Sequence, residues 1–198
     1  MIIMKKLFLN MIVILFLLTS LESKATCPPW ATNYSIFNFT ISKCVYEVIV
    51  CWKCPINYGA LWVSVDYFKQ VDPDCINGLT PQQIEDSIYA QLNTGSWLWG
   101  LCVGYPPCNP GPGQQYSIRR YNCWAMYNNG DNMEYYTCTD GSWCQMDGVI
   151  CWDNLLGPKA TPTTGWYQQG SVACPLQYWP PAPAPGYSSA CGLLFQCN

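Results

Sequence analysis

Cysteine is the residue type with the widest chemistry in this chain, because it occurs fourteen times while histidine does not occur at all. Cys51 and Cys54 form a CxxC pattern, which serves redox catalysis where a helix N-terminus lowers a thiol pKa. Here an apolar, β-branched run precedes the pair and a turn follows it at 55–59. No second CxxC pair exists to complete a tetrahedral zinc site. We therefore expect both cysteines to form structural disulfides.

The even cysteine count permits seven disulfides with no thiol left over in an oxidising compartment. Five residues separate Cys138 from Cys144, and Asp140-Gly141-Ser142 between them is a turn signal. Opposed positions of a hairpin meet the short separation a disulfide needs, so we expect a local bridge between these two. Spacing leaves the other pairings open. The candidates for bridging are Cys27, Cys44, Cys51, Cys54, Cys75, Cys102, Cys108, Cys123, Cys138, Cys144, Cys151, Cys174, Cys191 and Cys197.

Carboxylates are the remaining candidates for catalysis, because the absence of histidine removes Ser–His and Cys–His nucleophile activation. Paired glycosidase-type acids need a separation of about 5 to 9 Å, which the sequence does not set. The acidic turns at 72–74 and 128–132 offer oxygen ligands for calcium without an EF-hand pattern. We expect no catalytic residue, no cofactor and no metal. The acids considered, each also typical of a solvated strand or turn, are Glu47, Asp66, Glu134, Asp147 and Asp153.

Aromatic residues are the second compositional outlier, with ten tryptophans and fourteen tyrosines. Three tryptophans directly follow a cysteine, so one face of a strand could carry bridges and the other an aromatic row. The rings either pack the core against the disulfides or form an exposed platform for sugar rings or a neighbouring subunit. The candidate glycan or subunit contacts are Trp52, Trp124, Trp143, Trp152, Trp166 and Trp179.

The first half of the chain predicts strands and one helix. Residues 45–54 and 60–68 are β-branched and aromatic on either side of a five-residue turn, which predicts a hairpin. The first of these runs is apolar on both faces and should lie centrally in its sheet. Residues 34–41 alternate as a half-buried strand does. Thr80, Pro81 and Gln83 form a capping box that predicts a helix over 81–93.

The second half predicts a meander of three strands at 115–127, 133–139 and 142–153, joined by turn residues. Residues 157–170 and 179–186 are rich in proline and glycine and are predicted to be loops. We expect an α+β fold, mainly β, in which disulfides staple an antiparallel sheet or sandwich and one short helix accompanies it.

The N-terminal segment 1–25 has the three-part layout of a secretory signal peptide. Lys5 and Lys6 precede an apolar run, and Ser23-Lys24-Ala25 ends the segment with small residues at the cleavage positions. A retained membrane anchor is the alternative, but the run is shorter than the ~20 residues that span a bilayer. A lipid anchor on Cys27 would need a better lipoprotein box. We expect residues 26–198 to form one cysteine-rich extracellular domain.

The net charge of the chain limits the classes of partner that it can bind. The predicted leader contains three lysines and one glutamate, so its removal takes the formal net charge from −3 to −5. Nucleic acid and anionic membranes require clustered basic residues, and we expect neither as a partner. The sequons at Asn33 and Asn38 matter only in a eukaryotic host, and Ser87 lies in a short bacterial O-glycosylation pattern.

Three functions fit these features. We expect a secreted or cell-surface, non-enzymatic structural or adhesive protein, such as a subunit of a filament, sheath or surface layer, that reaches its place through the periplasm in a Gram-negative host. Its ends at 34–41 and 190–197 could then add to the sheet edge of a neighbouring copy. The alternative is a carbohydrate-binding module that uses exposed tryptophan and tyrosine. A carboxylate-based hydrolase is the second alternative. The expected partners are further copies of the chain or surface glycans.

Overall fold

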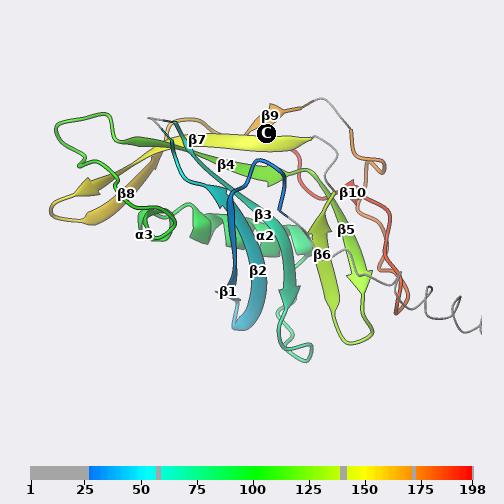
Figure 1. Cartoon of the computed structure of the whole chain (residues 1–198). Helices are drawn as coiled ribbons and strands as arrows, with labels where there is room; N and C mark the ends of the chain where they lie inside the picture. The colour runs from blue at the N-terminus through cyan, green and yellow to red at the C-terminus, as the bar shows by residue number, and fades with distance from the viewer. Residues whose placement is uncertain (1–26, 57–58, 139–141, 171–172, 198) are drawn as a thin grey trace, which may run out of the picture.

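The computed structural model describes residues 27–56, 59–138, 142–170 and 173–197, and these form ten strands of one curled sheet and two helices (Figure 1). The prediction of a mainly β fold stapled by disulfides is confirmed. The predicted signal peptide at 1–25 lies outside the described residues. No helix in the described part of the chain is long and apolar enough to cross a membrane.

The first three strands are β1 (Asn33–Ile41), β2 (Cys44–Lys53) and β3 (Leu61–Gln70), which pair antiparallel in chain order. The predicted hairpin and the predicted strand at 34–41 are both confirmed. β2 lies between β1 and β3, as its two apolar faces indicate. A two-residue turn joins β1 to β2, with φ of 44° at Ser42 and 71° at Lys43. Positive φ at both central positions is the type I′ geometry that matches the twist of paired strands.

The edge of β3 that faces away from β2 pairs with two different strands. Its first half, from Leu61 to Ser64, pairs parallel with β4 (Gln114–Tyr121), and Tyr67 to Lys69 pair antiparallel with β6 (Met133–Thr137). The register of β2 with β3 shifts between Ile49 and Val50, which leaves Asp66 as the extra residue of a β-bulge. The bulge therefore marks the point where the sheet forks.

Two arms extend from this fork. One arm continues from β4 to β7 (Trp143–Asp153), whose far edge carries β8 (Gly157–Pro162) and β9 (Tyr167–Gln169). The other continues from β6 to β5 (Cys123–Asn128) and the two-residue β10 (Gly192–Leu193).

The predicted meander of three strands is wrong in part, because the sheet forks. The strand expected at 115–127 breaks at the buried Asn122 into β4 and β5, one in each arm. The predicted hairpin from β5 to β6 is confirmed, but β6 does not pair with β7 in the described ladder, because β7 follows β4 into the other arm. The loop expected at 157–170 contains β8 and β9, whereas 179–186 holds no helix or strand.

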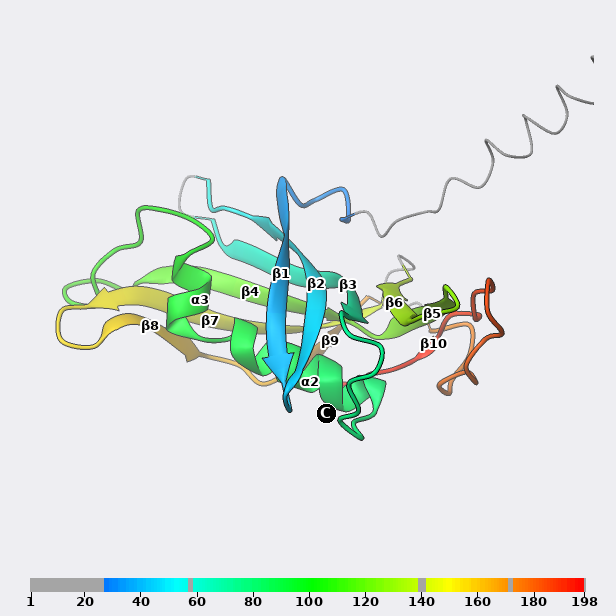
Figure 2. The same ribbon diagram turned by 90° about the horizontal axis from the view of Figure 1, so that it is seen from below.

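Both helices lie against the same side of β4 and β7 (Figure 2). Helix α2 (Pro81–Leu92) has the predicted capping box, and α3 (Gly95–Trp99) follows at once. Buried side chains from α2 meet those of β2, β3 and β4 in one hydrophobic core. A buried ion pair joins α2 to β4, since Arg120 Nε and Nη2 lie 3.0 and 2.7 Å from Glu85 Oε2. Ser87, in the glycosylation pattern, donates its hydroxyl to Gln83 O.

Every cysteine is bridged, so the prediction of seven disulfides is confirmed. The predicted Cys138–Cys144 bridge is wrong, because those cysteines lie in different arms of the sheet. Their spacing instead matches that of Cys191 and Cys197 on the C-terminal tail, which pair with them in order. The CxxC cysteines bond to two separate partners. The seven bridges are Cys27–Cys51, Cys44–Cys75, Cys54–Cys102, Cys108–Cys151, Cys123–Cys174, Cys138–Cys191 and Cys144–Cys197.

Candidate functional site

The side of the sheet opposite the helices carries a row of polar side chains, and we call this side the open face. Strand register places Ser64 of β3 beside Arg119 of β4, Arg119 beside Gln145 of β7, and Gln145 beside Tyr167 of β9. Alternate residues of a strand point to opposite faces. Tyr116 and Ile118 of β4 lie in the core, so Ser117 between them and Arg119 after them point to the open face.

Three tryptophans surround the Arg119 guanidinium, and we call these four residues the Arg119 cluster. The guanidinium carbon lies 3.6 Å from the ring centroid of Trp62, 5.0 Å from that of Trp143 and 5.1 Å from that of Trp30. All three distances are within the range of cation–π attraction. All three rings are half-buried, so each retains some surface in contact with solvent.

Arg119 is unusual because it is 9% exposed and yet forms no ion pair within 4.0 Å in the described part of the chain. Its Nε and the indole Nε1 of Trp143 are buried without a hydrogen-bond partner there. Burial lowers the pKa of Arg119 below its usual value. The guanidinium is therefore in contact with aromatic faces, and the charge of Asp147 acts on it from beyond ion-pair distance.

Asp147 of β7 lies on the same face, in register with Ser117 of β4. Its Oδ1 accepts hydrogen bonds from Ser117 Oγ at 2.5 Å and Gln145 Nε2 at 2.9 Å, and its Oδ2 accepts one from the Tyr167 hydroxyl. Burial alone would raise the pKa of Asp147, but these hydrogen bonds, together with the positive charge of Arg119, outweigh it and hold the pKa below its usual value. Asp147 is thus a fixed anion that orients three neighbouring polar groups.

The segment before β1 supplies Trp30 to the open face. The Cys27–Cys51 disulfide anchors this segment to β2, and Thr32 N–H donates to Trp52 O at 3.1 Å. The Trp30 ring packs 5.9 Å from that of Trp62, centroid to centroid. Covalent and hydrogen-bond anchors on both sides of Trp30 therefore hold the ring in the Arg119 cluster.

The open face offers a ligand both apolar ring faces and polar groups. Indole rings offer apolar faces, and Gln145, Asp147 and Tyr167 beside them offer donors and acceptors on rigid strands. The nearest carboxylate, that of Asp147, already accepts three hydrogen bonds. Within the described residues no group of three or more acidic or cysteine side chains could hold a metal ion.

The other acids considered from the sequence are spread over the fold, each held by a different partner. Glu47 pairs with Lys69 at 3.3 Å, and Glu134 accepts from Asn129. Asp153 accepts hydrogen bonds from two backbone N–H groups of the turn after β7. Asp66 accepts a hydrogen bond from the Thr137 hydroxyl. The oxygens in the two acidic turns also bond backbone N–H groups, those of Asp74, Asp131 and Asn132. Asp147 is therefore the only one of the five candidate acids, all of them in the described part of the chain, that belongs to the polar row beside the Arg119 cluster.

The six tryptophans predicted as glycan or subunit contacts also differ in burial and in location. Trp143 belongs to the Arg119 cluster, whereas Trp124 is fully buried in the core and presents no surface to a ligand. Trp52, Trp166 and Trp179 are half-buried against the core. Trp152 is 40% exposed at the far end of β7 and packs on Trp99. The remaining members of the cluster, Trp30, Trp62 and Arg119, were not among the predicted site residues.

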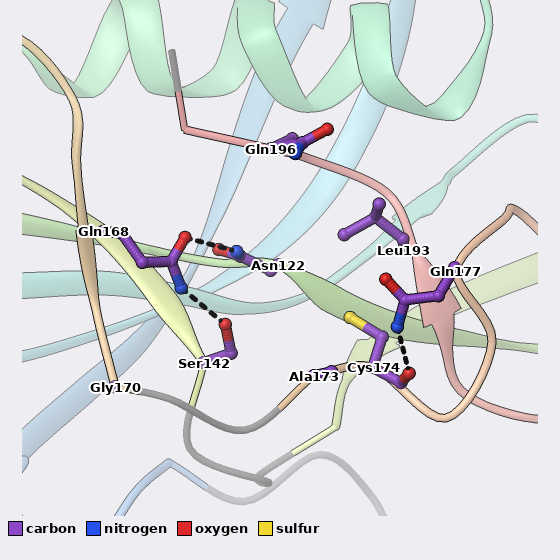
Figure 3. A pocket seen from close by; sticks show the side chains of 9 residues that line it. All are labelled: Asn122, Ser142, Gln168, Gly170, Ala173, Cys174, Gln177, Leu193 and Gln196. Carbon is purple, nitrogen blue, oxygen red and sulfur yellow. Dashed lines mark hydrogen bonds between the residues drawn. The ribbon is translucent and has the colours of Figure 1, made fainter.

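A pocket of about 300 Å³ lies where the C-terminal tail meets the two arms of the sheet (Figure 3). Its polar side chains largely satisfy one another. Gln168 Nε2 donates to Ser142 Oγ at 2.8 Å, Gln168 Oε1 accepts from Asn122 Nδ2, and Gln177 donates to Cys174 O. No charged residue is among those that line it. The Arg119 cluster is therefore the better candidate site.

Comparison of the chain with family models, curated proteins and solved structures finds no match in any of the three.

Proposed function

We propose that this chain is a secreted, non-enzymatic adhesive protein that binds carbohydrate through the Arg119 cluster and the polar row beside it. One observation carries the proposal: three half-buried tryptophans from three separate segments converge on one open sheet face, next to Gln145, Asp147 and Tyr167. Sugar rings have apolar faces and hydroxyl edges, and this mixture of indole faces and fixed polar groups complements both.

Rigidity supports a binding role. Trp62 and Trp143 project from strands in the middle of the sheet, and a disulfide anchors the segment that carries Trp30. Preorganised side chains lose little conformational entropy when a ligand binds. Seven disulfides suit the oxidising space outside the cell, which supports the proposed secretion.

The test is retention of the purified, disulfide-bonded protein on a panel of polysaccharides. The panel includes neutral polymers (cellulose, chitin, xylan) and acidic ones (alginate, chondroitin sulfate). We expect one class to retain the protein, and Trp62→Ala to weaken that binding at least about tenfold, equivalent to ~1.4 kcal/mol. The matched control is Trp152→Ala, which removes an exposed indole far along β7 and should leave the affinity unchanged.

Two outcomes would contradict the proposal. One is that no polymer retains the protein. The other is that Trp152→Ala weakens binding as much as Trp62→Ala while both variants keep their thermal unfolding midpoints. If Trp62→Ala lowers that midpoint, Trp30→Ala replaces it, because Trp30 lies outside the strands.

A further inference from the structure

Among the residues that the structure describes, the outer edge of β1 has backbone groups that no other strand pairs with. β1 pairs with β2 along its whole length, and no other described strand pairs with it. The two-residue turn makes Ile41 and Cys44 the closing hydrogen-bonded pair, so every second residue from Ile41 backwards bonds to β2. The N–H and C=O groups of Tyr34, Ile36 and Asn38 therefore point away from β2.

A helix side chain supports this assignment. Thr40 has the same parity as Ile36 and Asn38, and its carbonyl accepts a hydrogen bond from Gln91 Nε2 of α2 at 3.3 Å. That carbonyl therefore points away from β2. The carbonyl of Thr40 is therefore occupied within the protein, whereas no strand in the described part of the chain pairs with the outward backbone groups of Tyr34, Ile36 and Asn38.

β1 lacks the features that usually protect a strand edge. Natural edges are protected by charged residues, proline or bulges. Residues 33–41 contain no charged residue and no proline, and their register with β2 is continuous. Tyr34 and Ile36 are moreover 71% and 56% exposed. A long, regular, uncharged edge with exposed apolar side chains is a template for another strand.

We propose that this edge pairs antiparallel with the β1 edge of a second copy of the chain. The pairing places Ile36 opposite Ile36 of the other copy and Tyr34 opposite Asn38, so the outward backbone groups of all three residues are matched. Such a two-fold contact uses the same surface on both copies. The absence of charge on this segment means that two identical edges meet without repulsion, which favours a second copy over a charged partner.

The pairing would also make the protein bivalent. A two-fold axis perpendicular to the joined sheets keeps the same face of each on the same side. The two Arg119 clusters would then point in one direction and could bind one polymer together, which raises avidity without new contacts. This consequence rests on the proposed carbohydrate binding, whereas the strand pairing itself does not.

The test is the mass of the disulfide-bonded protein measured by sedimentation over a wide concentration range. We expect a concentration-dependent shift from one to two protomers. Ile36→Pro removes an N–H that β2 does not use, so it should leave the fold intact and the protein at one protomer. Ile36→Thr keeps that N–H and should still dimerise. Ile76→Ser, which removes an exposed apolar side chain elsewhere, should dimerise like the natural chain.

Three results would overturn the inference: one protomer at every concentration, dimers of Ile36→Pro, or loss of dimers in Ile36→Thr and Ile36→Pro alike. Amide hydrogen exchange of the natural chain gives a second readout if Ile36→Pro does not fold. The amides of Ile36 and Asn38 should exchange more slowly as protein concentration rises, and unchanged exchange would contradict strand pairing. Neither readout contains carbohydrate, so failure here is distinct from failure of polysaccharide binding.

Discussion

Asp66 is predicted to make the protein less stable as pH rises towards neutrality. It lies at the bulge where the sheet forks, is 2% exposed, and accepts a hydrogen bond from Thr137 Oγ1 at 2.5 Å. Burial raises its pKa to about 6, although the hydrogen bond from Thr137 acts in the opposite direction. The ordinary value is 3.8.

The direction in which pH changes the free energy of unfolding follows from proton binding. Between pH 3.8 and about 6 the folded protein holds a proton that the unfolded chain has released. The free energy of unfolding therefore falls as pH rises through this window. A shift of about two pKa units corresponds to about 3 kcal/mol at pH values above 6. Asp66→Asn removes the titration and keeps an oxygen that accepts from Thr137.

The assay is denaturant unfolding of the natural chain and Asp66→Asn, with disulfides intact, from acidic to slightly alkaline pH. We expect the two to be similarly stable below the ordinary Asp pKa, and the variant to become more stable by up to about 3 kcal/mol above pH 6. Asp131→Asn removes an exposed acid and serves as the control. The reasoning is refuted if the difference between Asp66→Asn and the natural chain does not change with pH.

Three further predictions concern the fold. Peptide mapping without reduction should recover Cys138 linked to Cys191 and Cys144 linked to Cys197, and a Cys138–Cys144 peptide would contradict the forked sheet. Gly148→Ala would place a Cβ 2.3 Å from the buried Tyr116 ring and should destabilise by about 1–3 kcal/mol in denaturant unfolding, whereas Gly165→Ala, with open space around it, should not. Thr80→Ala removes the hydroxyl that caps α2 and should cost about 1 kcal/mol in the same assay, while Thr80→Ser should retain most of the stability.

Local patterns in the sequence predicted local structure well. The capping box fixed the start of α2, the alternation at 34–41 marked β1, and the apolar runs around 55–59 predicted the β2–β3 hairpin. Each of these depends on residues close together in the chain. The turn at Ser42 and Lys43 carried no signal, because neither residue is typical of positive φ.

The fork was not predictable from such patterns. Nothing local indicates that the strand at 115–127 breaks at Asn122, or that one edge of β3 serves both β4 and β6. The wrong Cys138–Cys144 bridge follows directly from the assumed meander. Trp62, Arg119 and Asp147 lie far apart in sequence, so their meeting on one face depends on pairings between distant strands. Strand alternation alone would have shown only which face each occupies.

Carbohydrate is predicted to bind on the open face, at the Arg119 cluster. Hydroxyl-radical footprinting can follow each tryptophan with and without oligosaccharides released from the polymer that retains the protein. We predict protection of Trp30, Trp62 and Trp143 and unchanged oxidation of Trp152, which is exposed at the far end of β7. Protection of Trp152 with no change at the Arg119 cluster would contradict the account.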